Sequence, residues 1–99
     1  MSEASCRIDI WLWRARFAKS RSLAAAMVER GAVRLTHHGV QTRLDKPSRS
    51  VHVGDSLVFA LGGRLIDLTV QGLGERRGPA EEARTLYAPR DTGRDTGAG

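Results

Sequence analysis

The hydrophobic pattern of the chain changes its period at Gly31. In residues 8–15, apolar side chains recur every three or four positions, which places them on one face of a helix. In residues 33–35 and 57–61, the large apolar side chains fall on every second position, which is typical of strands. The change of period predicts an α+β fold in which two helices pack on a small, mostly antiparallel sheet.

Two helices are expected before Gly31. The first spans about residues 7–17, and a short break at residues 18–20 separates it from the second. Ser20 or Ser22 supplies the N-cap of the second helix by accepting a bond from a free backbone N–H. Gly31 follows that helix, where a left-handed conformation carries no steric penalty for glycine. Helices joined this closely pack as a helical hairpin or a helix-turn-helix.

Several short strands are expected after Gly31. They lie near residues 33–35, 40–42, 51–53, 57–61 and 65–73. Turns are predicted at residues 37–39, 54–55 and 62–63, where glycine or a short polar residue occurs. Residues 44–50, which include Pro47, form an irregular connection.

The two ends of the chain are expected to differ from its folded centre. Residues 1–6 are predicted to form a loose arm. A last short helix begins near Pro79, whose missing N–H is tolerated in a first helical turn. Its apolar stripe consists of Ala80, Ala83, Leu86 and Tyr87. Residues 88–99 carry almost no apolar side chains, which predicts a disordered tail.

The charge of the chain favours a polyanionic partner. Its 99 residues suffice for one domain and carry 16 Lys and Arg, nearly all of them Arg, against 11 Asp and Glu. Arginine binds phosphate bidentately and stacks on bases, so this composition indicates nucleic acid rather than solubility charge alone. The single cysteine, Cys6, excludes an internal disulfide and a multi-cysteine zinc site. Without a membrane-length apolar run or a signal-peptide pattern, the protein is expected to be cytoplasmic and to contact no membrane.

Most of the positive surplus lies in residues 7–21. This stretch carries five cations and one acid: Arg7, Arg14, Arg16, Lys19, Arg21 and Asp9. Solvated helix faces usually mix both signs, and this stretch does not. Arg21 follows Ser20 into the first turn of the second helix, whose free N–H groups already favour a phosphate. We therefore predict that these residues form a cationic ridge that binds RNA, with a merely solvated face as the alternative.

Two residues of this stretch have more than one interpretation. Trp13 lies off the apolar face of the first helix, where it either stacks on an unpaired base or packs against the sheet. Asp9 has neither a paired carboxylate nor a histidine nearby in sequence, which disfavours a catalytic acid. We interpret Asp9 as a helix N-terminal residue or as an ion-pair partner that aims Arg16 or another cation.

Further candidate RNA contacts follow in the strand region. They are Arg34, His38, Arg43, Lys46 and Arg49. These side chains either extend the ridge or are scattered surface charge. The histidines at positions 37, 38 and 52 are not expected to form a metal site, because two are adjacent and no carboxylate or cysteine was found at ligand spacing. No Gly-rich nucleotide loop is present, so we expect neither a cofactor nor enzymatic activity.

The same residues resemble a known family. The runs 7–13 (Arg-Ile-Asp-Ile-Trp-Leu-Trp), 16–17, 19–21 and 31–33 resemble the RNA-binding domain named after protein S4 of the small ribosomal subunit. The Trp-Leu-Trp run, residues 75–80 (Glu-Arg-Arg-Gly-Pro-Ala), 82–83 and 86–87 resemble more narrowly the bacterial heat shock protein 15 family. The resemblance covers about residues 7–87.

This resemblance implies a fold and a set of partners. The fold is αL-type, with an RNA-binding domain at residues 7–73, a short C-terminal helical extension at 74–87, and RNA bound on the helical side. The residues that match family positions are Arg7, Asp9, Arg16, Lys19, Ser20 and Arg21. The implied partners are ribosomal RNA and the large ribosomal subunit carrying a nascent chain on tRNA, in rescue or recycling, while contact with peptidyl-tRNA itself stays open. Nothing in the sequence indicates a large apolar interface, so we expect a monomer.

The chain departs from the family pattern at two places, and its basic second helix is also compatible with a different class of function. Ile10 stands where the family usually has Lys, and residues 36–39 (Thr-His-His-Gly) replace a Val-Asn-Gly-type turn. The alternative class is a helix-turn-helix DNA-binding regulator, whose basic second helix would enter a major groove. The alanines at 24–26 argue against it, because they offer no groups that read base edges. An RNA-modifying enzyme is not expected, because no catalytic domain follows.

Overall fold

The computed structural model describes residues 4–90. The helices are α1 (Ile8–Arg14), α2 (Arg21–Glu29) and α3 (Ala80–Ala83), followed by the 3-10 turn η1 (Arg84–Leu86). The strands are β1 (Ser5–Arg7), β2 (Val33–His37), β3 (Val40–Arg43), β4 (Ser50–His52), β5 (Ser56–Leu61), β6 (Arg64–Val70) and β7 (Tyr87–Pro89). The predicted α+β class, with two helices ahead of a sheet and a short helix near the end, is confirmed.

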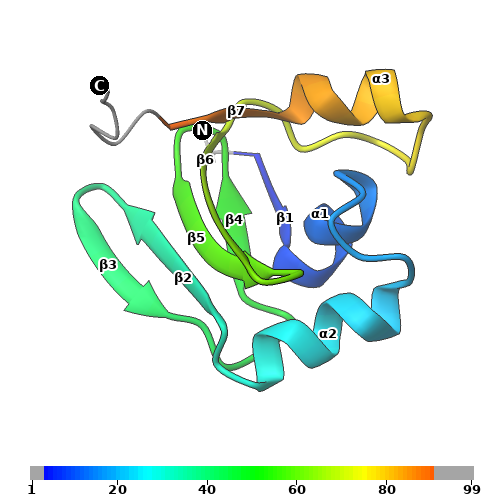
Figure 1. Ribbon diagram of the computed structural model, residues 1–99. Coiled ribbons are helices and arrows are strands. Elements are labelled where there is room, and N and C mark those ends of the chain that lie inside the picture. Colours follow the sequence, from blue (N-terminus) through cyan, green and yellow to red (C-terminus); the bar gives the residue numbers. More distant parts are fainter. Residues whose placement is uncertain (1–3, 91–99) are drawn as a thin grey trace, which may run out of the picture.

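The strands form two antiparallel sheets (Figure 1). Five of them pair in the order β3-β2-β5-β6-β7, and β1 pairs separately with β4. His38 and Gly39 join β2 to β3 with φ angles of 50° and 82°. Positive φ at both central residues defines a type I′ turn, which matches the twist of a hairpin. The predicted turn at this place is confirmed, with histidine in the left-handed position that asparagine more often takes.

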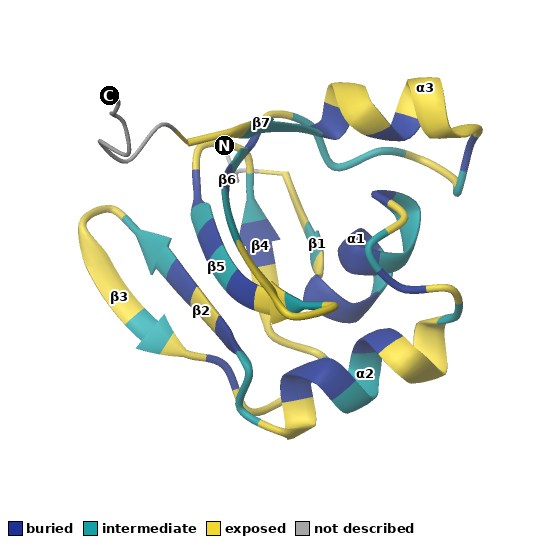
Figure 2. Ribbon diagram, viewed as in Figure 1, coloured by how far each residue is buried: buried dark blue, intermediate teal, exposed yellow. Residues whose placement is uncertain are grey.

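The core lies between the helical pair and the sheet (Figure 2). Trp11 of α1 and Phe59 of β5 are fully buried, and Phe17 lies between them with its ring 6.1 Å from Trp11 and 5.1 Å from Phe59. Burying a large apolar side chain stabilises a fold by about 1.5–3 kcal/mol. Contacts of this kind fix the orientation of α1 against the sheet.

Helix α1 is shorter than its predicted span of 7–17. After the C-cap residue Ala15, the backbone turns left-handed at Arg16, with φ of 67°. The Phe17 N–H donates to the Leu12 carbonyl at 2.9 Å, and the Arg16 N–H donates to the Trp13 carbonyl at 3.1 Å. This pair of bonds is a Schellman motif, which satisfies the last carbonyls of a helix. The early end turns Phe17 into the core, an outcome that apolar periodicity alone does not predict.

Helix α2 begins and ends as predicted. The Ser20 hydroxyl accepts a bond from the Leu23 N–H at 3.1 Å and is the N-cap. At the other end, Gly31 is left-handed, with φ of 75°. Both ends are therefore fixed by local side-chain chemistry that the sequence shows directly.

Both ends of the described chain are more ordered than predicted. Residues 5 and 6, expected in a loose arm, belong to β1 and pair with β4. Tyr87, expected in a helix, and residues 88–89, expected in a disordered tail, form β7 on the open edge of β6. The Arg90 N–H continues the contact by donating to the Asp67 carbonyl at 2.9 Å. Pairing satisfies the backbone groups of an edge strand, which explains the order; the rest of the predicted tail, residues 91–99, lies outside the described residues.

Candidate nucleic-acid interface

The turn between α1 and α2 carries a group of exposed cations. These junction cations are Arg16, Lys19 and Arg21. Among the described residues, no acidic side chain lies within ion-pair distance of any of them. Three of the predicted RNA-binding side chains are therefore exposed within six consecutive residues, and none of them has an ion-pair partner among residues 4–90.

The start of α2 is electrostatically suited to an anion. Its first turn contains no acidic residue and begins with Arg21. The start of a helix is the positive end of its macrodipole, so the positive charge of Arg21 is unfavourable there unless an anion is bound. A phosphate placed there would accept bonds from free N–H groups of the first turn and also offset the Arg21 charge. Ser20 contributes as the N-cap, which fixes the position of that turn.

Arg16 is held in place by a segment from the C-terminal part of the chain. Its Nε donates to the Gly78 carbonyl at 2.7 Å, while the residue as a whole stays exposed. Gly78 belongs to residues 71–79, an irregular segment that follows β6 and lies against α1 (Figure 1). We call this segment the C-terminal strap. One nitrogen of Arg16 thus orients the side chain, and its other nitrogens are left available for a phosphate.

Arg14 and Arg77 bind the strap to α1 from opposite directions. Arg14 is half-buried and donates to the Gly74 carbonyl at 2.8 Å, so its guanidinium is used inside the fold. Arg77 donates in return to the Trp13 carbonyl at 3.1 Å, and the Trp11 indole N–H donates to the Gly72 carbonyl at 2.8 Å. The prediction that Arg14 shares an exposed ridge with Arg7 does not fit this geometry. The role of the strap is not evident from the sequence, although residues 75–79 carry part of the narrower family resemblance.

Asp9 orients Arg7. Both carboxylate oxygens accept from the Arg7 guanidinium, at 3.1 and 2.9 Å, and Asp9 is almost fully buried. The hydrogen bond and the nearby negative charge raise the pKa of Arg7 above its ordinary value. The ion-pair interpretation of Asp9 is therefore confirmed, with Arg7 as the cation in place of Arg16. A buried carboxylate of this kind positions the Arg7 guanidinium, which is a candidate RNA contact, and is not itself suited to meet a phosphate.

The irregular connection after β3 lies beside Arg7. The Ile8 N–H donates to the Arg49 carbonyl at 2.8 Å, and the Asp9 N–H donates to the Pro47 carbonyl at 3.3 Å. Lys46 and Arg49 are both exposed, so with Arg7 they form a second group, which we call the connection cations. Because these carbonyls already occupy the first N–H groups of α1, a phosphate here would meet side chains only.

Arg34 and Arg43 form a third group beyond the other end of α2. They are directly opposite each other on β2 and β3, and both are exposed. The Arg43 side chain lies over Gly31, where an added Cβ would be 3.5 Å from its Cδ. His38 is exposed in the turn at the far end of the same hairpin. The predicted extension of the ridge is thus divided into separate groups.

Trp13 is half-buried. Among residues 4–90, it is not one of the partly buried hydrophobic side chains that pack against the core. This position agrees better with the base-stacking interpretation than with packing against the sheet.

Cys6 is also half-buried, and burial raises the pKa of its thiol, which keeps it protonated and unreactive near neutral pH.

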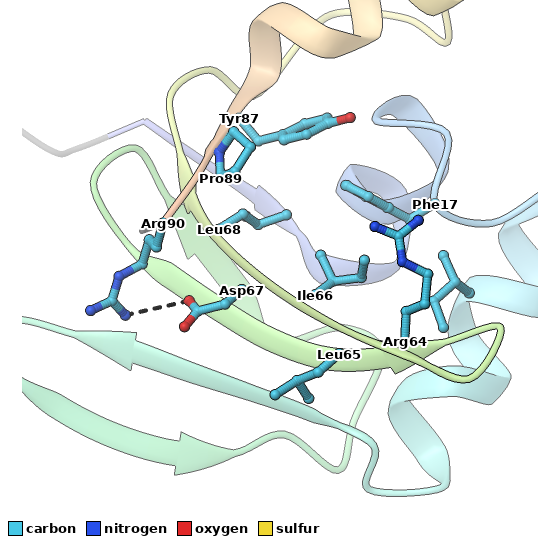
Figure 3. A pocket seen from close by; sticks show the side chains of 10 residues that line it. Phe17, Arg64, Leu65, Ile66, Asp67, Leu68, Tyr87, Pro89 and Arg90 are labelled. Carbon is cyan, nitrogen blue, oxygen red and sulfur yellow. Dashed lines mark ion pairs between the residues drawn. The ribbon is translucent and has the colours of Figure 1, made fainter. Parts of the chain in front are cut away.

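A hollow on the β6–β7 side adds aromatic and cationic groups that sequence analysis missed. Figure 3 shows Phe17, Tyr87 and apolar residues of β6 around it, with the Arg64 side chain directed toward Phe17. The acidic residue in the lining of this hollow is Asp67, whose Oδ1 lies 3.5 Å from Arg90 Nη1 in an ion pair. In the described part of the chain, no helix has the length and apolar character to cross a membrane.

Comparison with known proteins agrees with this geometry. The family model described as S4 domain matches residues 6–35, which contain α1, the junction and α2. With its helical pair on an antiparallel sheet, the chain is a protein with an S4-type RNA-binding fold.

Longer matches identify the family. The chain is 40% identical over 87 residues to the heat shock protein 15 homolog of Haemophilus influenzae and 41% identical over 81 residues to heat shock protein 15 of Escherichia coli K12. These matches cover 88% and 82% of this chain. A solved structure, described as the trimeric structure of Vibrio cholerae heat shock protein 15, superposes with a TM-score of 0.78 at 38% identity, covering 88% of this chain and 83% of that one. The chain belongs to the heat shock protein 15 family.

The match does not extend over the full length of the curated relatives. The chain covers 63% of the Haemophilus protein and 57% of the Escherichia protein. The chain therefore spans about three fifths of the length of these relatives, and the shared part is the S4-type fold with its strap.

Proposed function

We propose that this protein binds structured ribosomal RNA through the junction cations Arg16, Lys19 and Arg21. The observation that carries this proposal is three exposed cations between the end of α1 and the first residue of α2, with no acidic side chain of the described residues in ion-pair range. Phosphate oxygens satisfy such a group in two ways, by charge-assisted bonds to the side chains and by the N–H groups of the helix start. Binding here needs shape and backbone charge, which suits folded RNA.

The connection cations and the Arg34–Arg43 pair extend this interface. Arg7 is aimed by Asp9, and Lys46 and Arg49 lie on the connection whose backbone binds the start of α1. Trp13 adds an aromatic ring for stacking on an unpaired base, worth about 1–3 kcal/mol when a base is seated. His38 would contact RNA only if the bound RNA extends along the β2–β3 hairpin.

The family resemblance leads to a more specific partner. We propose that the RNA belongs to a large ribosomal subunit that still carries a nascent chain on tRNA, and that the protein acts in rescue or recycling of such subunits in the cytoplasm. No side chain of the described interface is arranged for catalysis, which agrees with a binding role. We retain the monomer as the predicted state, and light scattering in solution distinguishes it from a trimer like that of the Vibrio relative.

Cosedimentation with separated ribosomal subunits tests this function. We expect the protein to pellet with large subunits more than with small ones, and more strongly when peptidyl-tRNA is present. Arg21→Ala should weaken binding by about 1–3 kcal/mol, roughly 5- to 150-fold, because a charge-assisted contact is lost. Arg84→Ala is the matched control, since Arg84 is exposed on η1, away from the junction.

Three outcomes would contradict the proposal. Equal pelleting with both subunits would remove the large-subunit assignment. Wild-type affinity in Arg21→Ala would remove the junction as the contact surface. Tighter binding to duplex DNA than to ribosomal RNA at equal salt would favour the DNA-binding alternative.

A further inference from the structure

Three histidines and a buried aspartate meet where β2 and β4 end and β5 begins (Figure 1). His37 is the last residue of β2, His52 is the last residue of β4, and Asp55 precedes β5 by one position. The sequence pattern indicated no carboxylate at ligand spacing from these histidines. Asp55 lies three residues after His52, and the fold brings His37 to the same place, so that expectation is corrected.

The side chains converge closely. His37 Nδ1 lies 2.5 Å from Asp55 Oδ1, and His52 Nδ1 lies 3.6 Å from Asp55 Oδ2. One ligand atom from each of the three residues lies within 4.8 Å of the other two. Two atoms bound to one zinc ion at about 2.0–2.2 Å lie at most about 4.4 Å apart, so small side-chain rotations suffice to place an ion between them.

Asp55 is held in the orientation that a ligand needs. It is 3% exposed, and its Oδ2 accepts a bond from the His52 backbone N–H at 2.9 Å. His38 stacks on the His37 ring at a centroid distance of 3.9 Å, which restrains that imidazole from the other side. Contacts of this kind, made by groups that are not themselves ligands, fix the first ligands of a metal and tune its affinity.

The cluster is accessible to an ion from solvent. His37 and His52 line a surface hollow, and their side chains are 34% and 25% exposed. Arg49 lines the same hollow, so an open coordination position would face a cationic rim suited to water or an anionic oxygen. Two imidazoles and one carboxylate, with a coordination position left open, are a donor set that binds zinc-type ions. Hard ions such as magnesium prefer a set made of oxygen atoms.

We propose that His37, His52 and Asp55 form a binding site for a zinc-class divalent transition-metal ion, which ties the β2–β3 hairpin to the β4–β5 turn. The bound ion would replace the direct His37–Asp55 contact. Because binding is stronger to the folded than to the unfolded chain, the ion would raise the midpoint temperature of unfolding as its concentration rises. The site stands apart from the junction cations and does not depend on the proposed RNA binding.

Calorimetric titration of tag-free protein with zinc chloride tests the site. We expect one equivalent to bind and the unfolding midpoint to rise with zinc. His37→Asn and His52→Asn should each weaken binding at least tenfold, because one ligand is lost. His38→Asn is a comparison variant that removes the ring stacked on His37 but no ligand of the cluster, and asparagine keeps the left-handed turn position. It should still bind one equivalent, with a smaller loss of affinity than either ligand variant.

A measurement on the unmutated protein keeps the test independent of how the variants fold. Cobalt(II) bound by nitrogen and oxygen ligands in a low-symmetry site should give visible absorption bands that zinc then abolishes by displacement. The proposal is overturned if wild-type protein shows neither heat nor a cobalt spectrum. It is also overturned if both ligand variants still bind one equivalent, or if Cys6→Ser abolishes binding.

Discussion

Arg16 combines an unfavourable backbone with a useful side chain. Its φ of 67° is the left-handed conformation that follows a Schellman-type helix end, where glycine is the usual residue. A non-glycine residue in such a conformation costs about 1 kcal/mol or more. The bond from the guanidinium to the Gly78 carbonyl offsets part of this cost. The proposed contact with RNA gives a functional reason for arginine at this position.

Replacing Arg16 by glycine separates these contributions. Arg16→Gly keeps the backbone conformation at no steric cost but removes the guanidinium. We expect the free energy of unfolding to change by no more than about 1 kcal/mol, because relief of strain offsets the lost hydrogen bond. RNA affinity should fall by about 1–3 kcal/mol. Chemical denaturation and filter binding measure the two quantities.

Arg16→Ala is the comparison for this prediction. It loses the same guanidinium and keeps the left-handed strain, so it should be less stable than Arg16→Gly by roughly 1 kcal/mol while binding RNA equally weakly. If Arg16→Gly bound RNA as tightly as the unmutated protein, Arg16 would be a structural residue only.

At the level of elements, the C-terminal strap determines which guanidinium groups are used inside the fold and which stay exposed. Arg14→Met removes the donor to the Gly74 carbonyl while keeping an apolar stem of similar length. Leaving a part-buried carbonyl without its partner should destabilise the fold by about 1–3 kcal/mol. The RNA affinity of the folded protein should stay unchanged, because this guanidinium is used inside the fold. Thermal unfolding and filter binding well below the midpoint check both statements, and an affinity loss matching that of Arg21→Ala would return Arg14 to the interface.

The β2–β3 hairpin carries a second conflict between stability and charge. Arg34 and Arg43 are directly opposite on neighbouring strands, and like charges at such positions destabilise a sheet. Arg43→Thr should therefore stabilise the fold by about 0.2–1 kcal/mol and weaken RNA binding at the same time. Opposite signs in denaturation and binding measurements would support a functional reason for the pair. Gln41→Thr, at an exposed position of the same strand, is the control and should leave RNA affinity unchanged.

The sequence predicted those elements whose ends are set by local chemistry. Ser20 and Gly31 bound α2 as expected, because an N-cap hydroxyl and a left-handed glycine act within a few residues. The strap and β7 were not predicted, because they depend on contacts that join distant segments. The ion pair of Asp9 was predicted without fixing its partner, because side-chain geometry decides that the cation is Arg7. Arg14 and Arg16 look equivalent in sequence, and the packing of residues 71–79 makes Arg14 a half-buried donor while Arg16, which also donates to the strap, stays exposed.

At the scale of the whole molecule, positive charge is divided rather than spread evenly. The junction cations, the connection cations and the Arg34–Arg43 pair lie at the start of α2, beside the start of α1, and beyond the end of α2. Exposed acids occur both beside these groups, with Glu29 at the end of α2 and Asp45 next to Lys46, and away from them, with Glu81 and Glu82 on α3. A folded RNA that follows α2 would meet several cations in succession, which a single compact anion would not.

The salt dependence of RNA binding measures how many of these cations take part. Each phosphate neutralised releases about 0.7–0.9 of a counterion, so four or five contacts predict a slope of roughly −3 to −4.5 for log K against log salt concentration. Arg21→Ala should make the slope shallower by about one contact, whereas Arg14→Met should leave it unchanged because its charge lies within the fold. Equal slopes for the unmutated protein and Arg21→Ala would mean that the α2 start meets no phosphate, and a slope near zero would mean recognition through bases alone. The two variants remove the same formal charge, so a difference between their slopes reports where the charge lies and not how much of it there is.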